Sequence, residues 1–199
     1  KPNFDWEYID QTGAIMRTLE TPELDDLDDG VPHFQEGRAL FYDFDSNQYG
    51  YLDRDGNIAI ATQYAEARSF SDGLAAIKIS DSWGFIDSSN KTRISPRFIE
   101  AGDFSEGLVP ARENTNTWGY FDKSGRQVIE PQFEEARPFY DGRAAVMIDG
   151  FWGYIDRSGN LLTPADFDEV QDFRKGAGRV TLQFTNPEDP DDRTTRWGY

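Results

Sequence analysis

Residues 74–87 (LAAIKISDSWGFID) alternate between apolar and polar or small positions, which predicts two β-strands joined by a tight turn. In the first strand every second residue from Ala75 to Ile79 is apolar. After the turn, Trp83 and Phe85 fall on one face of the second strand, because successive side chains of a strand point to opposite sides. The segment is therefore predicted to form a β-hairpin.

The start of the second strand recurs along the chain. It is written at 83–87 (WGFID), 118–122 (WGYFD), 152–156 (WGYID) and 197–199 (WGY), with degenerate copies at 6–10 (WEYID) and 49–53 (YGYLD). The steps from 49 to 83, 118 and 152 are 34, 35 and 34 residues, flanked by steps of 43 (6 to 49) and 45 (152 to 197). A fixed period in this range indicates a repeat architecture.

Each copy continues with Asp-x-x-Gly, which predicts a turn. The Asp side chain accepts backbone N–H bonds, and the fourth position favours a residue that tolerates positive φ. Glycine or asparagine occupies this position, at Gly56, Asn90, Gly125 and Gly159. An EF-hand reading of residues 53–57 is disfavoured because the further ligands of that loop are missing.

Further positions recur at constant offsets from this turn. They are an aromatic residue (Tyr64, Phe98, Phe133, Phe167), a small residue (Ala67, Ala101, Ala136, Val170), a phenylalanine (Phe70, Phe104, Phe139, Phe173) and a glycine (Gly73, Gly107, Gly142, Gly176). Together with Pro96 and Pro131, these positions resemble the bacterial WG repeat, whose pattern runs W-G-[YF]-I-D-x-x-G, P-x-F-x-x-A and F-x-x-G-L-A-x-V. The resemblance implies a fold class and no agreed activity.

The predicted fold is all-β: tandem repeats of about 35 residues, each contributing a β-hairpin, stacked as an elongated, twisted, solenoid-like array. The alternative is a closed, propeller-like ring in which residues 197–199 form the closing strand. We predict a single domain over 1–199, with units 4–48, 49–82, 83–117, 118–151 and 152–196 and a partial motif at 197–199. Gly84 points away from the Trp83 face, and we expect a neighbouring repeat to pack there.

Composition narrows the classes of partner. The 199 residues contain 20 Lys and Arg against 37 Asp and Glu, giving a net charge of −17 and a pI near 4.3. This charge disfavours nucleic acid and anionic membranes and favours a partner with a basic surface. No apolar stretch could span a bilayer, so no direct membrane insertion is expected. Localisation stays open, with export or the cell envelope of a bacterium favoured over the cytoplasm.

The sequence offers little catalytic chemistry. It has no cysteine and one histidine, His33, and lacks phosphate-binding loops and nucleophile elbows. Acidic residues cluster in the inserts 21–30 and 186–193, which are predicted to be irregular, solvated loops. These clusters are Asp25, Asp26, Asp28 and Asp29, and Glu188, Asp189, Asp191 and Asp192; weak cation binding is their alternative role. We predict no catalytic, cofactor or metal residues.

Two sets of residues are predicted to matter. The repeat core is assigned to Trp83, Gly84, Trp118, Gly119, Trp152, Gly153, Phe104 and Phe139. The candidate partner-binding residues lie at the hairpin tips, where the copies differ: Asp81, Ser82, Asn114, Thr115, Asn116, Thr117, Asp149 and Phe151.

Three functions compete. The first is a non-enzymatic protein–protein interaction or scaffold module, favoured by a repeat scaffold without a catalytic constellation. The second is a carbohydrate-binding or envelope-associated module, which needs exposed tryptophans. The third is a carboxylate-based hydrolase, which needs two close acids in a cleft.

Overall fold

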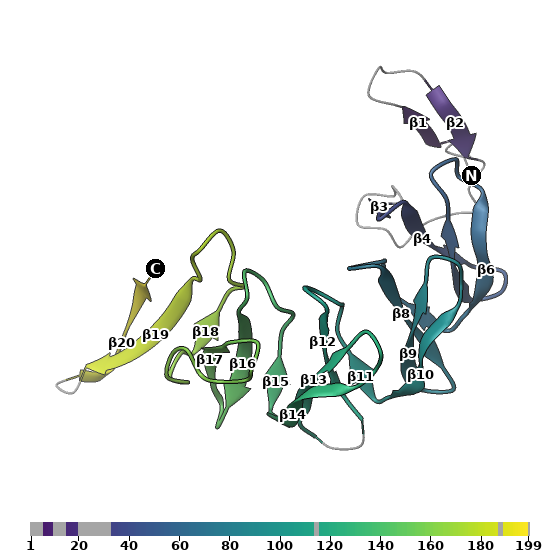
Figure 1. Ribbon diagram of the computed structural model, residues 1–199. Coiled ribbons are helices and arrows are strands. Elements are labelled where there is room, and N and C mark those ends of the chain that lie inside the picture. Colours follow the sequence, from purple (N-terminus) through teal and green to yellow (C-terminus); the bar gives the residue numbers. More distant parts are fainter. Residues whose placement is uncertain (1–5, 10–14, 20–32, 114–115, 187–188, 199) are drawn as a thin grey trace. The chain divides into compact units, whose positions relative to one another are not determined.

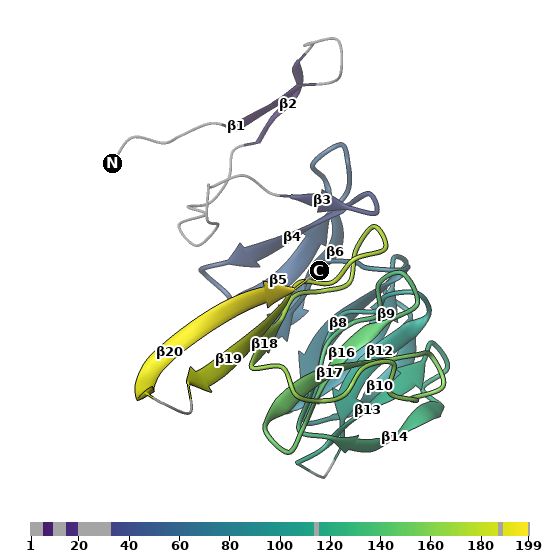
Figure 2. The same ribbon diagram turned by 90° about the vertical axis from the view of Figure 1, so that its left-hand side faces the viewer.

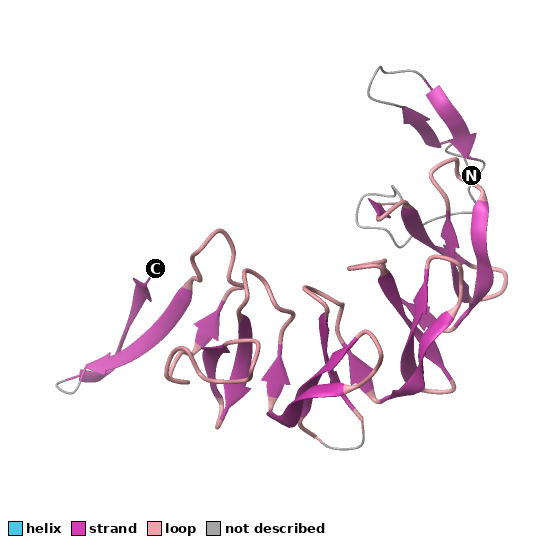
Figure 3. Cartoon of the chain, in the orientation of Figure 1, coloured by secondary structure: helices cyan, strands magenta, loops and turns pink. Residues whose placement is uncertain are grey.

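The protein is all-β, as predicted. A computed structural model describes residues 6–9, 15–19, 33–113, 116–186 and 189–198. These residues form strands, turns and loops and contain no helix (Figure 3). The chain divides into two compact units, Lys1–Pro96 and Arg97–Tyr199 (Figure 1).

The first unit contains three antiparallel sheets. A hairpin pairs β1 (Trp6–Ile9) with β2 (Ile15–Leu19). The next sheet has the order β3 (Phe34–Gln35), β4 (Arg38–Asp43), β5 (Gln48–Leu52), β6 (Ile58–Tyr64). The third has the order β10 (Thr92–Phe98), β9 (Ser82–Asp87), β8 (Leu74–Ile79), β7 (Glu66–Ala67), and β10 ends just past the boundary of the unit.

The second unit also contains three sheets. The first has the order β11 (Glu100–Ala101), β12 (Leu108–Arg112), β13 (Trp118–Asp122), β14 (Gln127–Phe133). The next consists of β15 (Glu135–Ala136), β16 (Ala144–Ile148) and β17 (Phe151–Ile155). The last consists of β18 (Glu169–Val170), β19 (Val180–Asn186) and β20 (Asp189–Gly198).

The predicted hairpins are confirmed. Strands β8 and β9 are joined at Ser80 and Asp81, with φ of 47° and 66°, and β16 and β17 at Asp149 and Gly150, with φ of 51° and 80°. Positive φ at both central residues is the requirement of a type I′ turn. The boundaries of the sheets differ from those of the sequence repeats. Each Trp-Gly motif lies in the second strand of a hairpin, whose first strand belongs to the preceding sequence repeat.

A third strand, β10 or β14, extends the hairpin and was missing from the prediction. In β14 the apolar residues Ile129 and Phe133 are four apart, yet they pair with Tyr120 and Trp118, which are only two apart. The extra residues form a bulge around Pro131. Period-two alternation is therefore lost, and the segment does not look like a strand in the sequence.

The motif glycine faces this bulge, which corrects the expectation that a neighbouring repeat packs on Gly84. A Cβ on Gly84 would lie 2.7 Å from the carbonyl oxygen of Ile94 and 2.7 Å from the nitrogen of Pro96, both in β10 of the same sheet. Gly119 has the same surroundings in β14, at 2.7 Å from the carbonyl oxygen of Ile129. Glycine and the proline bulge are thus complementary parts of one sheet.

The aromatic residue that follows the glycine makes the contact with the next sheet. Tyr51, Tyr120 and Tyr154 pack edge-to-face on Phe70, Phe139 and Phe173, with ring centres 4.9, 4.8 and 5.7 Å apart. Their hydroxyls donate hydrogen bonds to the carbonyl oxygens of Arg68, Arg137 and Gln171, each 17 residues further on, at 2.8, 2.8 and 2.5 Å. Burial raises the pKa of Tyr120, so this hydroxyl stays protonated as a donor. Three repeats are therefore tied to the following one by an aromatic pair and a hydrogen bond, whereas the copy at 83–87 has Phe85, which lacks the hydroxyl.

The Asp-x-x-Gly turns are confirmed in all four copies. Gly56, Asn90, Gly125 and Gly159 have φ of 75°, 64°, 81° and 85°. In each turn the Asp carboxylate accepts the N–H groups of the residues two and four positions on, at 2.8–3.0 Å. The Phe-x-x-Gly segment closes a second two-residue turn, as between Ser71 and Leu74.

These turns predict a loss of stability in acid. Hydrogen bonds from the side chains of Ser89 and Asn160 hold the pKa values of Asp87 and Asp156 below the ordinary 3.8. The unfolded chain therefore binds protons more readily than the folded chain. The stabilisation by these carboxylates is fully present above pH 3.8 and is lost as the pH falls through their lower folded-state pKa values. We expect the free energy of unfolding, measured by urea denaturation from pH 6 to pH 2, to decline less steeply in the Asp87→Asn, Asp156→Asn double variant. An unchanged slope would contradict the assignment.

The C-terminal insert is a hairpin and not the irregular loop that was predicted. Strands β19 and β20 pair from Val180↔Gly198 to Asn186↔Asp189, and Figure 2 shows them as two long arrows side by side. Asp191 and Asp192 therefore lie in a strand, whereas Glu188 and the cluster Asp25, Asp26, Asp28 and Asp29 lie outside the described residues. The alternation of residues 180–186 (VTLQFTN) explains the strand, since Val180, Leu182 and Phe184 are apolar.

The terminal Trp-Gly start belongs to this hairpin. Trp197 pairs with Thr181 in β19, so this part of the motif is a strand of the last sheet. Tyr199 lies outside the described residues. The choice between an open array and a ring stays a prediction, which small-angle X-ray scattering of the full chain separates.

Candidate functional site

The two ends of the sheets differ in how their charges are used. The base end carries the Asp-x-x-Gly and Phe-x-x-Gly turns, and the tip end carries the turns within the hairpins β8–β9, β12–β13 and β16–β17.

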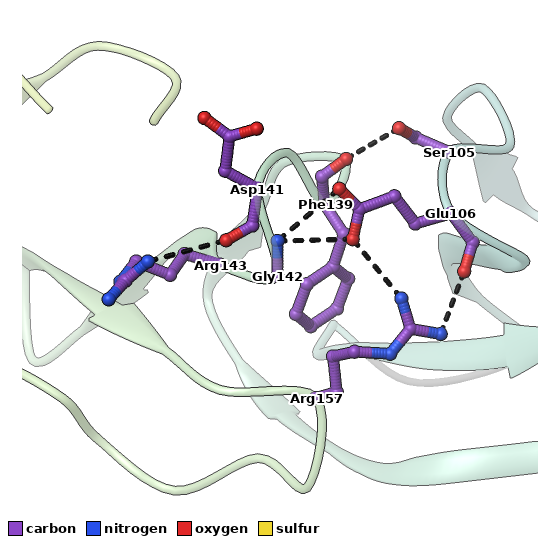
Figure 4. Close-up of polar contacts among 7 residues, drawn as sticks. All are labelled: Ser105, Glu106, Phe139, Asp141, Gly142, Arg143 and Arg157. Carbon is purple, nitrogen blue, oxygen red and sulfur yellow. Dashed lines mark hydrogen bonds and ion pairs between the residues drawn. The ribbon is translucent and has the colours of Figure 1, made fainter. Parts of the chain in front are cut away.

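At the base end, acidic side chains are tied up by neighbouring repeats. The carboxylate of Glu106 accepts the N–H of Gly142 at 3.1 Å and a hydrogen bond from Arg157 at 3.1 Å, and its backbone carbonyl accepts a second bond from Arg157 at 2.7 Å (Figure 4). The same tie recurs from Gly73 to Glu36 at 2.8 Å and from Gly176 to Asp141 at 3.1 Å. These carboxylates join neighbouring repeats, and Glu106 is also paired with Arg157.

The predicted tip residues are only partly brought together. Asp149 and Phe151 flank one turn in the second unit, where the N–H of Gly150 donates to the carboxylate of Glu134 at 3.0 Å. Phe151 is 46% exposed, although it is a large apolar side chain. Asp81 is exposed at the β8–β9 turn, with Ser82 beside it, in the first unit. Asn116 is exposed and Thr117 half-buried, and Asn114 and Thr115 lie outside the described residues.

Most residues assigned to the repeat core are buried. Gly84, Gly119 and Gly153 are buried, as are Phe104 and Phe139, and Trp83 and Trp152 are each only 6% exposed. Trp118 is the exception, since it is half-buried and packs at the margin of the core. Its position at the tip edge of β13 leaves part of the ring facing a cleft.

Two clefts lie beside tryptophans at the tip end of the second unit. One, of about 370 Å³, is lined by Trp118 and Arg112 of the sheet β11–β14, by Glu135 of β15 in the next sheet, and by Glu134 between the two sheets. The other, of about 340 Å³, is lined by Trp152 and Arg137 and by Glu169, Gln171, Arg179 and Thr181 of the next sheet and its surroundings. The clefts therefore occupy equivalent places in successive repeats and have different polar linings.

Cations of the chain itself sit against the tryptophan rings. The guanidinium of Arg112 lies 5.7 Å from the ring centre of Trp118, and that of Arg137 lies 4.6 Å from the ring centre of Trp152. Arg137 also donates to the carbonyl oxygen of Val170 at 2.9 Å. These contacts order the walls of the clefts.

A recurring glutamate completes the tip end. Glu66, Glu100, Glu135 and Glu169 each precede the small residue of the repeat and pair across the sheet with positions 78, 112, 147 and 181. Glu66 binds Lys78 at 2.6 Å and Glu100 binds Arg112 at 2.5 Å. These pairs were not predicted from the sequence, although glutamate and cation are 12 residues apart in both copies.

The described residues offer no cluster of three or more His, Asp or Glu side chains placed to hold a metal ion. His33 is exposed. Within the described ranges, no helix is long and apolar enough to cross a membrane.

A family model described as WG containing repeat matches the chain four times, at residues 49–81, 83–115, 118–150 and 152–182, which is more than half of its length. No curated protein matches the chain. A crystal structure of a eukaryotic initiation factor is similar over 82% of this chain and 50% of its own, with 12% identity and a TM-score of 0.56. This chain thus spans half of that protein, and the likeness shows the fold alone.

Two further structures give lower TM-scores. BamB from Moraxella catarrhalis is similar over 94% of this chain and 61% of its own, with 12% identity and a TM-score of 0.47. The computationally designed Ika4 protein is similar over 65% of this chain and 87% of its own, with 16% identity and a TM-score of 0.44.

Proposed function

Because the chain belongs to the WG containing repeat family, we propose that its repeat scaffold serves as a non-enzymatic module that binds another protein through the tip ends of its sheets. The observation that carries the proposal is the pair of clefts beside Trp118 and Trp152. A constant scaffold with linings that vary from repeat to repeat suits recognition, because the scaffold holds each variable side chain in a defined place.

An exposed apolar side chain supports the tip end as the binding surface. At the tip end of the second unit, exposed Phe151 lies next to acidic Asp149 and Glu134. An apolar side chain in an acidic surround fits a partner with a basic rim, in keeping with the net charge of −17.

The glycan alternative has less support. Stacking on a sugar needs an exposed tryptophan face, whereas Trp83 and Trp152 are 6% exposed. Trp118 is half-buried and lines a cleft, so it is the better candidate among these three tryptophans.

The test compares two exposed apolar positions of the second unit. Phe151 lies at the tip and is 46% exposed, and Val128 lies in the outer strand β14 and is 42% exposed. The full chain is cross-linked to its partners in the source organism, the partner is purified, and its Kd is measured by calorimetry. We expect Phe151→Ser to weaken binding at least fivefold and Val128→Ser to leave the Kd unchanged.

Two results would overturn the proposal. One is a partner whose binding is indifferent to Phe151→Ser. The other is a glycan array with a specific signal that is lost in Trp118→Ala, together with no protein partner, which would favour the carbohydrate-binding alternative.

A further inference from the structure

The recurring tip-end glutamate forms an ion pair across the sheet in two repeats and faces an uncharged residue in the other two. In the sheets of β8 and β12 the cross-strand position holds Lys78 or Arg112, and an ion pair forms. In the next two sheets the same position holds Met147 and Thr181. The cationic half of the pair is therefore missing opposite Glu135 and Glu169.

These two carboxylates are accessible. Glu135 and Glu169 are exposed, and within the part of the chain that the structure describes their side chains make no hydrogen bond or ion pair. Glu135 lines the cleft beside Trp118, and Glu169 lines the cleft beside Trp152. The tryptophan of each cleft already carries an arginine of this chain, Arg112 on Trp118 and Arg137 on Trp152. The exposed carboxylate is therefore the group that attracts a further lysine or arginine side chain.

We propose that the partner supplies the two missing cations, with one Lys or Arg side chain docking at Glu135 and a second at Glu169. This inference rests on the proposed function and names the chemistry of the partner. The chain itself shows that the position binds a cation, since Lys78 and Arg112 do so in the sister repeats at 2.6 and 2.5 Å.

The expected spacing of the two sites suggests the segment that fits. We take the sites to be roughly 10 Å apart, the usual separation of packed sheets. A polyproline II segment presents every third side chain on one side, with a rise of about 3.1 Å per residue, so residues three apart are roughly 9 Å apart. The partner segment is therefore Lys/Arg-x-x-Lys/Arg in polyproline II conformation, and aromatic-lined grooves are known to accept such segments.

The nearby arginines do not occupy the two sites. Arg112 is paired with Glu100, and Arg137 donates to the carbonyl oxygen of Val170 and lies 3.9 Å from Asp172. Both cations thus interact with groups other than Glu135 and Glu169. Arg179 also lines the cleft of Glu169, and among the described residues it forms no ion pair with Glu169.

The test uses a fluorescein-labelled, proline-rich dodecapeptide with two lysines three residues apart, titrated into the full chain and followed by fluorescence anisotropy. Met147→Arg rebuilds the ion pair of the sister repeats and closes the first site. Glu135→Gln removes its charge without adding bulk, and Glu169→Gln removes the charge of the second site. We expect each variant to weaken binding about fivefold.

The control is Glu130→Gln, which makes the same change in net charge at an exposed position of β14. It should leave the affinity unchanged, and a peptide with a single lysine should bind at least fivefold more weakly than the parent. No saturable binding of the two-lysine peptide, or equal binding by wild type, Glu135→Gln and Glu169→Gln, would overturn the inference.

The same variants are then measured with the purified native partner. If Phe151→Ser weakens that complex while Glu135→Gln and Glu169→Gln do not, the cation sites are refuted and the protein-binding function stands. If none of the three weakens it, the tip end is not the binding surface and both proposals fail.

Discussion

Replacing Trp152 by Ala should lower the free energy of unfolding by about 3–5 kcal/mol, the range for truncation of a large buried aromatic residue. The ring is 6% exposed and belongs to a core cluster with Tyr154 and Val170. The guanidinium of Arg137, 4.6 Å from the ring centre, would lose its stacking partner as well. Urea denaturation of the full chain measures the change, with separate transitions analysed if the two compact units unfold independently.

Trp118→Ala is the matched comparison. Because Trp118 is half-buried at the margin of its cluster, its truncation should cost only about 1–2 kcal/mol. Equal losses for Trp118→Ala and Trp152→Ala would show that the two tryptophans have the same structural role, against the difference in their burial.

Gly119→Ala should destabilise the second unit by about 3 kcal/mol, at the upper end of the range for overpacking. The new Cβ would lie 2.7 Å from the carbonyl oxygen of Ile129 and 2.9 Å from the nitrogen of Pro131. Both are backbone atoms of β14, so the strand itself has to move and its pairing with β13 is disturbed. Thermal and urea denaturation measure the loss.

Gly107→Asn provides the control for glycine replacement. A Cβ at Gly107 meets nothing within 4 Å, and its φ of +81° is one that asparagine tolerates better than other residues. We expect a cost below about 1 kcal/mol. A similarly small cost for Gly119→Ala would show that the bulge of β14 relaxes freely and that the motif glycine is not sterically required.

The hairpins could be predicted from sequence because apolar residues recur at every second position, as at Ala75, Ile77 and Ile79 and again at Trp83 and Phe85. The outer strand could not, because the bulge around Pro131 puts Ile129 and Phe133 four residues apart. For the same reason the surroundings of Gly119 were predicted only in part. The missing side chain correctly indicated that another backbone segment lies close by, but that segment is β14, the strand that was not predicted.

The candidate site was harder to predict than the fold. Tip residues such as Phe151 were identified because hairpin turns vary between copies. The lack of a cation opposite Glu135 and Glu169 can be recognised only from the strand register, which pairs these residues with Met147 and Thr181. Sequence alone contains the offset of 12 residues, but it does not say that the two positions face each other.

The offset between sheets and sequence repeats bears on how such a chain can be recombined. A duplicated segment of residues 83–117 would begin in β9, the second strand of the hairpin β8–β9. Such a segment gives a complete sheet only when its first and last strands pair with strands of the flanking repeats. The natural exchange points are instead the single residues between sheets, Ile99 between β10 and β11 and Glu134 between β14 and β15. A block cut at these points carries whole sheets, so shuffled or lengthened versions of this protein should be assembled there and not at the tryptophans.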